Sequence, residues 1–150
     1  MRILELASDD DTRALGAQLA LLLRRGDVVA LRGDLGAGKT TLVRGLIQAL
    51  LGPEEEVPSP TYTLVQMYEG PDFPLWHFDL YRLQEADDVQ ELGWDETQDG
   101  AALIEWPDRA GAHLPAIRLD VFLEISGEGR RARLEPGGEG WQGRLDERFV

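Results

Sequence analysis

The chain has 150 residues, of which 28 are acidic and 15 are basic, so its formal net charge is −13. A hydrophobic fraction of 43% at this length predicts one globular domain with its own core and argues against a disordered chain. The absence of cysteine excludes disulfides, thiolate catalysis and cysteine-bound metal centres.

The same composition sets expectations for location and partners. No apolar run reaches the ~18–20 residues that span a bilayer, and the first residues lack the pattern of a secretory signal. We therefore expect a cytoplasmic protein without membrane contact, which the lack of cysteine also permits. A strongly acidic surface repels phosphate backbones, so strong direct binding to nucleic acid is not expected.

The first third of the chain alternates between strand and helix patterns. Residues 3–6 predict a short strand, and Ser8 is a suitable N-cap for a helix whose leucines recur at helical spacing. The apolar run at 27–31 predicts a buried strand. After a glycine-rich turn at 33–38, a second amphipathic helix is expected from Lys39 to about Leu51.

The rest of the chain predicts strands joined by turns, after an acidic, proline-broken loop. In chain order we expect strands at 61–68, 75–81, 101–104, 117–125 and 130–134, with a surface helix over 85–91. Short turns separate the first two of these strands and the last two, which indicates two hairpins. Residues 136–150 form a glycine-rich tail that we expect to be mobile, and no linker divides the chain.

These patterns predict an α/β fold with three layers. A strand followed by a glycine turn, a helix and later apolar strands is typical of a mostly parallel sheet with helices on its faces. The expected hairpins add antiparallel pairing. We therefore predict a mixed, mostly parallel central sheet flanked by helices, in one domain covering residues 1–150.

A phosphate-loop pattern occupies the turn between the buried strand and the second helix. Residues 33–40, GDLGAGKT, fit the Walker A pattern G-x-x-x-x-G-K-[ST]. The glycines let backbone N–H groups converge on an anion, and the helix N-terminus adds further unpaired N–H groups. Lys39, the only lysine of the chain, brings a positive charge to the outer phosphates, and the Thr40 hydroxyl can bind Mg²⁺. The pattern predicts a P-loop NTPase-like fold with a nucleoside triphosphate site.

Two carboxylates follow predicted strands and are candidates for the metal and water side of this site. Phosphoryl transfer needs an acid that holds Mg²⁺ or orients the attacking group. Glu105 follows the apolar run 101–104, and we assign it to the magnesium shell. Asp79 follows 75–78, and we assign it to orienting water or to a contact behind the metal. The competing interpretation is that either acid is a solvated carboxylate at a strand end.

Other residues give weaker indications. Residues 59–63, SPTYT, stand where nucleotide-sensing loops lie, although a plain helix-to-strand connection is the alternative. No lysine follows Lys39, so the N-K-x-D pattern that selects guanine is absent and adenine is favoured. Trp106 adjoins Glu105 and has more functional weight than the other tryptophans, whereas His77 is expected to serve packing.

Taken together, four motifs resemble those of the bacterial TsaE family of ATPases. They are residues 33–41 (GDLGAGKTT), 59–65 (SPTYTLV), 77–83 (HFDLYRL) and 104–107 (IEWP). The resemblance implies a small P-loop ATPase needed for threonylcarbamoylation of the adenosine next to the anticodon (t6A) in tRNAs reading ANN codons. It implies ATP and Mg²⁺ as cofactors and the TsaB and TsaD proteins as partners, with tRNA reached indirectly through them.

The resemblance also assigns roles to individual residues. It implies nucleotide contacts from the loop and its helix, from a tryptophan and from a late arginine, namely Asp34, Leu35, Gly36, Ala37, Gly38, Lys39, Thr40, Thr41, Trp106 and Arg130. Magnesium would be held by Thr40 and Glu105. Lys39, Asp79 and Glu105 would act in ATP hydrolysis, with Asp79 important for the cleavage step.

Two other functions share the phosphate loop. A small-molecule kinase would need an acceptor pocket and usually an arginine-bearing lid, but residues 85–98 are acidic and contain no arginine. A nucleotide-gated binding module with negligible turnover would use the loop at 59–63 as its switch. We expect slow Mg-ATP hydrolysis that partner proteins gate or accelerate, with an acidic face of the chain docking on a basic partner surface.

Overall fold

The computed structural model describes residues 1–149, which form one sheet and a set of covering helices. The strands are β1 (Arg2–Leu6), β2 (Val28–Arg32), β3 (Val65–Glu69), β4 (Pro74–Asp79), β5 (Ala101–Glu105), β6 (Arg118–Ser126) and β7 (Gly129–Gly137). The α-helices are α1 (Asp9–Leu22), α2 (Lys39–Leu51) and α3 (Glu139–Arg148), and three 3₁₀ segments are η1 (Ala86–Leu92), η2 (Trp94–Asp99) and η3 (Pro107–His113). Over residues 1–149, none of the helices combines the length and apolar character needed to cross a membrane.

The sheet has seven strands in the order β1-β7-β6-β2-β5-β4-β3. Its four central strands, β6, β2, β5 and β4, run parallel to one another. The outer pairings are antiparallel, and two of them, β3 with β4 and β6 with β7, are the predicted hairpins. The predicted α/β fold with a mixed sheet is confirmed, and its parallel part is limited to the centre. Parallel neighbours end at the same edge, so β2, β4 and β5 bring their last residues together.

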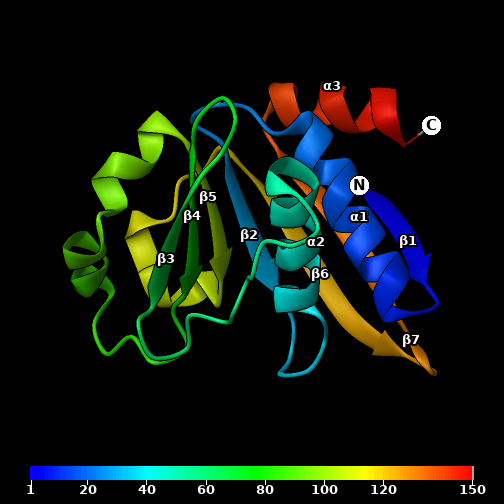
Figure 1. The fold of residues 1–150 in the computed structure, drawn as a ribbon, viewed down its shortest axis with the longest axis horizontal. Coiled ribbons are helices and arrows are strands. Elements are labelled where there is room, and N and C mark those ends of the chain that lie inside the picture. Colours follow the sequence, from blue (N-terminus) through cyan, green and yellow to red (C-terminus); the bar gives the residue numbers. More distant parts are fainter. Residues whose placement is uncertain (150) are drawn as a thin grey trace.

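Helices cover the sheet on both sides, as Figure 1 shows. The helices α1, α2 and α3 share one hydrophobic core with the sheet, and the 3₁₀ segments share a second core on the other side. The helices α1 and α2 approach closely because glycines lie between them. A Cβ atom on Gly16 would overlap the Leu42 carbonyl, and one on Gly45 would overlap the backbone of Arg13.

Alternation along the strands explains how one sheet serves two cores. In β2, Val29 and Leu31 face the helices, whereas Val28 faces the 3₁₀ segments. In β4, Leu75 belongs to the first core and Trp76 to the second. Strands buried on both faces read as continuous apolar runs, which is why the central strands were evident in the sequence.

The structure differs from the prediction at one strand and one surface helix. The strand predicted at 61–68 begins only at Val65, because Leu64 has a left-handed backbone with φ of 69° and its N–H donates to the Pro60 carbonyl at 2.8 Å. A left-handed residue cannot continue an extended strand. The surface helix predicted at 85–91 is the 3₁₀ segment η1, whose Val89 is buried in the second core.

The glycine-rich tail also differs from the expectation of a mobile segment. Residues Glu139–Arg148 form α3, in which Trp141 is 1% exposed and Leu145 is buried, and residue 150 of the predicted tail lies outside the described residues. The Arg144 guanidinium donates to both oxygens of Asp27, at 2.7 and 3.2 Å, and to the carbonyl of Leu22 at the end of α1. The buried Trp141 ring and the ion pair of Arg144 with Asp27 therefore attach this helix to parts of the domain that are far away in the sequence.

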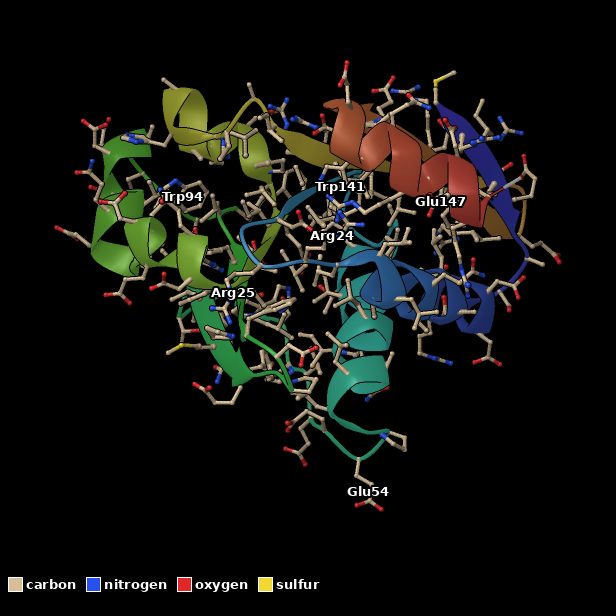
Figure 2. The ribbon with its side chains drawn as sticks, turned by 90° about the horizontal axis from the view of Figure 1, so that it is seen from above. Arg24, Arg25, Glu54, Trp94, Trp141 and Glu147 are labelled. Atoms are coloured by element: carbon tan, nitrogen blue, oxygen red, sulfur yellow. The ribbon has the colours of Figure 1, made fainter. Side chains whose placement is uncertain are left out.

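Replacing Trp141 with alanine should lower the free energy of unfolding by about 3–5 kcal/mol, because the lost ring leaves a cavity in the core. Urea denaturation followed by far-ultraviolet circular dichroism measures the change. The matched control is Glu147→Ala on the exposed side of the same helix, which should change stability by no more than about 0.5 kcal/mol. Figure 2 labels both side chains on α3. Equal, small effects of the two substitutions would contradict the docking of α3.

Candidate functional site

A pocket lies where β2, β4 and β5 end, with a volume of about 310 Å³. Its walls come from the loop after β2, the first turn of α2, the segment at 59–61, the ends of β4 and β5 and the start of β7. Ligand sites of α/β sheets form at the carboxyl ends of the parallel strands. The fold therefore places the predicted phosphate loop in the expected position.

Glycines give the phosphate loop its shape. Gly33, Gly36 and Gly38 all have positive φ, at 147°, 83° and 107°, in a region that other residues rarely adopt. Gly33 also passes so close to the Leu123 carbonyl that a Cβ atom would overlap it. Gly38 is the N-cap of α2, and no described side chain caps the first turn of this helix. Its N–H groups are therefore available to an anion.

The Lys39 side chain turns back over the loop that precedes it. Its ammonium donates to the carbonyls of Gly33 and Asp34, the latter at 3.1 Å, and lies 4.1 Å from the centre of the Trp106 ring. Burial lowers the pKa of Lys39, while the nearby charges of Glu105, Asp79 and Asp34 oppose this shift. The ammonium is thus surrounded by oxygens and an aromatic face at the base of the pocket.

Glu105 lies at the end of β5 and is only 3% exposed. The Thr40 hydroxyl, from the first turn of α2, is 3.0 Å from Oε1 and 2.9 Å from Oε2 of this carboxylate. His77 Nε2, from β4, is 2.6 Å from Oε2. The alternative of a solvated carboxylate at a strand end therefore does not hold for Glu105, because three elements enclose it.

Asp79 stands beside Glu105, since the two residues are register partners of β4 and β5. Its Oδ1 accepts the Tyr81 backbone N–H at 3.1 Å, and its Oδ2 accepts the Ser59 hydroxyl at 3.3 Å. The side chain is buried but lines the pocket. Two donors thus fix the direction of a carboxylate that faces the same space as Lys39.

The segment at 59–63 forms the rim of the pocket. Ser59 and Thr61 line it, and their hydroxyls are 3.0 Å apart. Tyr62 is 81% exposed, with the Arg82 guanidinium 4.6 Å from the centre of its ring. The segment therefore places hydroxyls toward the pocket and an aromatic ring outward.

Trp106 and Arg130 close the pocket from two further sides. Trp106 has a left-handed backbone with φ of 58°, and its ring lies 4.9 Å from that of Tyr81, centre to centre. Arg130, at the start of β7, donates to the Gly36 carbonyl at 3.0 Å. This bond links the last hairpin to the phosphate loop, although 94 residues separate the two positions.

The structure brings most of the predicted site residues into this one pocket. Those that line it are Leu35, Gly36, Gly38, Lys39, Thr40, Thr41, Asp79, Glu105, Trp106 and Arg130. Asp34 and Ala37 do not line it, because the Ala37 side chain lies in the core and the Asp34 carbonyl accepts from Lys39. Their predicted contact with a nucleotide stays a prediction.

Sequence reasoning missed three residues of the site. His77 bonds Glu105 in addition to filling space, and its place two residues before Asp79 on one strand was the available signal. Tyr81 and Asp9 line the pocket. Tyr81 lies within the motif at 77–83. Asp9 is the first residue of α1, and nothing in the sequence indicated that this helix would begin beside the phosphate loop.

The oxygen donors at the pocket fit a magnesium ion bound together with a nucleotide. Within residues 1–149, no group of three or more His, Cys, Asp or Glu side chains could hold a metal ion. Mg²⁺ in phosphate sites needs only one or two protein oxygens, because phosphates and water complete its shell. The adjacent hydroxyl of Thr40 and carboxylate of Glu105 supply such oxygens.

Comparisons with known proteins show a family to which the chain is similar. The family described as threonylcarbamoyl adenosine biosynthesis protein TsaE matches residues 6–133. The tRNA threonylcarbamoyladenosine biosynthesis protein TsaE of Rickettsia felis is 38% identical over 86% of this chain and 76% of its own length. Its counterpart in Bacillus subtilis is 37% identical over 81% of this chain and 77% of its own length.

A solved structure is similar over nearly the whole chain. The crystal structure of Bacillus subtilis YdiB superposes with a TM-score of 0.81, at 29% identity, over 97% of this chain and 92% of that one. The family match covers both the phosphate loop and the strands that carry Asp79 and Glu105. The chain therefore belongs to the TsaE family of threonylcarbamoyl adenosine biosynthesis proteins.

Proposed function

We propose that this protein binds Mg-ATP in the pocket at the phosphate loop, hydrolyses it slowly, and thereby supports t6A formation in tRNA together with TsaB and TsaD. One observation carries the ATPase part of the proposal. A glycine loop on an uncapped helix, the ammonium of Lys39 and the oxygen pair of Thr40 and Glu105 all meet in a single pocket. The names of the relatives support the pathway, since they describe those proteins as acting in tRNA threonylcarbamoyladenosine biosynthesis.

The loop supports triphosphate binding through short-range attraction. Backbone N–H groups at a helix start carry partial positive charge, and each can donate to a phosphate oxygen. The Lys39 ammonium now donates to the carbonyls of Gly33 and Asp34, which are weaker acceptors than phosphate oxygens. Exchange of these carbonyls for β- and γ-phosphate oxygens would strengthen its hydrogen bonds.

The two acids support different parts of hydrolysis. Thr40 and Glu105 would hold Mg²⁺, which neutralises charge on the outer phosphates. Asp79 has its two oxygens directed by Tyr81 and Ser59, so it can accept a hydrogen bond from an attacking water and orient it. This division follows from position, because Glu105 contacts the phosphate-loop helix and Asp79 contacts the rim segment.

The position of the acidic segment at 85–98 disfavours the kinase alternative. Val89 of η1 and Trp94 of η2 are buried in the second core, on the side of the sheet opposite α1 and α2. The segment therefore covers the sheet and does not fold over the pocket. A kinase needs a lid there that excludes water from the transferred phosphate.

Binding and turnover of Mg-ATP are the direct test. Calorimetry should detect saturable binding of Mg-ATP, and Lys39→Ala should weaken it by about 10–100-fold, because the charged hydrogen bonds to phosphate are lost. Arg131→Ala is the control, since it removes one positive charge that pairs with Glu5 outside the pocket. An absence of heat with well-folded wild-type protein would overturn the proposal.

The product of turnover separates the ATPase from the kinase. With labelled ATP and a pool of metabolites, we expect slow release of inorganic phosphate. A phosphorylated metabolite appearing faster than phosphate would favour the kinase.

The two acids should give distinct defects. Glu105→Gln should raise the Mg²⁺ concentration required for ATP binding by about tenfold or more, because a charged metal ligand becomes a neutral one. Asp79→Asn should leave ATP affinity close to that of the wild type and lower kcat by about 10²–10⁴-fold. Calorimetry across Mg²⁺ concentrations and single-turnover kinetics measure the two effects. Normal turnover in both variants would contradict the assigned roles.

Exposed apolar side chains beside the pocket support a role for partner proteins. Leu35, in the phosphate loop, is 67% exposed, and Tyr62, in the rim segment, is also exposed. A partner protein that covered both groups would remove their apolar surface from water. A partner seated there would touch the segments that border a bound nucleotide.

A pull-down with purified TsaB and TsaD, with and without ATP, tests this part. We expect retention of both proteins that depends on nucleotide, and we expect Tyr62→Ser to reduce it without changing ATP affinity. Met67→Ser, on the exposed part of β3, is a control for the loss of an apolar surface group. If a resin carrying the chain retained no more TsaB and TsaD than a resin without it, with or without ATP, the partnership would be contradicted.

A further inference from the structure

His77 is a completely buried polar side chain that the proposed ATPase mechanism leaves without a task. It lies in the middle of β4 with no exposed surface. Its neighbours along the strand, Trp76 and Phe78, point into the second core, so His77 points to the opposite face, as do Leu75 and Asp79. That face carries the phosphate-loop helix α2. The imidazole therefore lies on the same face as Asp79 and next to Glu105, two of the buried charged groups that line the pocket.

The hydrogen bond of His77 has one direction when Glu105 is ionised. Nε2 lies 2.6 Å from Oε2 of Glu105, and an ionised carboxylate only accepts hydrogen bonds. The proton of the ring must therefore be on Nε2. Consistent with this, Nδ1 is buried and has no hydrogen-bond partner among the described residues. An imidazole with the proton on Nδ1 would leave a buried donor unused and place two lone pairs against each other.

This bond fixes one of the two oxygens of Glu105. The Thr40 hydroxyl has a single proton and lies at nearly equal distances from both oxygens, so it does not choose between them. The Nε2–H group reaches Oε2 alone. The buried histidine thus sets the rotation of the carboxylate group and leaves Oε1 without a second fixed donor.

We propose that His77 is a positioning residue, which holds Glu105 by an Nε2–H···Oε2 hydrogen bond so that the carboxylate presents its other oxygen to the magnesium ion of bound Mg-ATP. This inference rests on the proposed function of the pocket. Residues that hydrogen-bond a metal ligand orient it and sustain its basicity, and their loss weakens metal binding by about 10–100-fold. A histidine that only filled space would have no such effect on the metal.

Two amide substitutions of His77 test whether a hydrogen-bond donor must extend as far as Glu105. His77→Gln keeps an N–H donor at about the position of Nε2, whereas His77→Asn has the same amide one methylene shorter. Mn²⁺ serves as the probe, because its binding in the presence of a non-hydrolysable ATP analogue can be followed by electron paramagnetic resonance. We expect Mn²⁺ affinity close to that of the wild type for His77→Gln and about 10–100-fold weaker for His77→Asn. Metal-free binding of the analogue should be unchanged in both.

Several results would overturn the proposal. Mn²⁺ affinities of both variants close to that of the wild type would show that the donor has no role. A loss of metal-free analogue binding as large as the loss of Mn²⁺ binding would reveal a general structural defect. Failure of the wild-type protein to bind the analogue at all, with or without Mn²⁺, would instead remove the proposed function on which the inference rests.

A measurement on the wild-type chain keeps the test independent of folding in the variants. Long-range proton–nitrogen nuclear magnetic resonance distinguishes the protonated ring nitrogen from the unprotonated one. We expect the proton of His77 on Nε2, and His113, the other histidine, is a partly exposed internal reference. A proton on Nδ1 alone would overturn the proposal.

Discussion

The site depends on the burial of charges of opposite sign around one pocket. The ammonium of Lys39 and the carboxylates of Asp79 and Glu105 are each no more than 5% exposed. An isolated charge in such a place would be strongly destabilising, whereas charges with partners and hydrogen bonds are tolerated. Removal of one member would leave the remaining buried charges with less compensation. A charged ligand entering this space would meet groups that hydrogen bonds already orient.

The loop that borders this cluster is held from several directions. Gly33 passes against the backbone of β6, and Arg130 at the start of β7 donates to the carbonyl of Gly36. The hairpin of β6 and β7 thus supports the phosphate loop from behind, although it lies at the other end of the chain. Such support keeps the N–H groups of the loop directed into the pocket before any ligand arrives. Anion sites made of backbone groups rely on this preorganisation.

The acidic composition does not conflict with an anion site. Charges separated by more than about 8 Å are largely screened at physiological salt. A phosphate in the proposed site would lie at contact distance from the N–H groups of α2 and the Lys39 ammonium, so their attraction would outweigh the distant acidic surface. The net charge of −13 therefore affects how the whole protein encounters its partners. The electrostatic potential inside the pocket is set mainly by the groups that line it.

Sequence and tertiary structure determined different parts of this protein. The phosphate loop, the central strands and the acids at 79 and 105 were predictable, because a glycine pattern and apolar runs are local signals that depend on a few neighbouring residues. The helix at the chain's end was not, because its attachment through Trp141 and Arg144 uses partners that lie far away in sequence. The task inferred for His77 also needed the fold. An alternating strand pattern predicts which side chains share a face of the strand. Only the pairing of β4 with β5 determines that the Glu105 carboxylate lies next to His77 on that face.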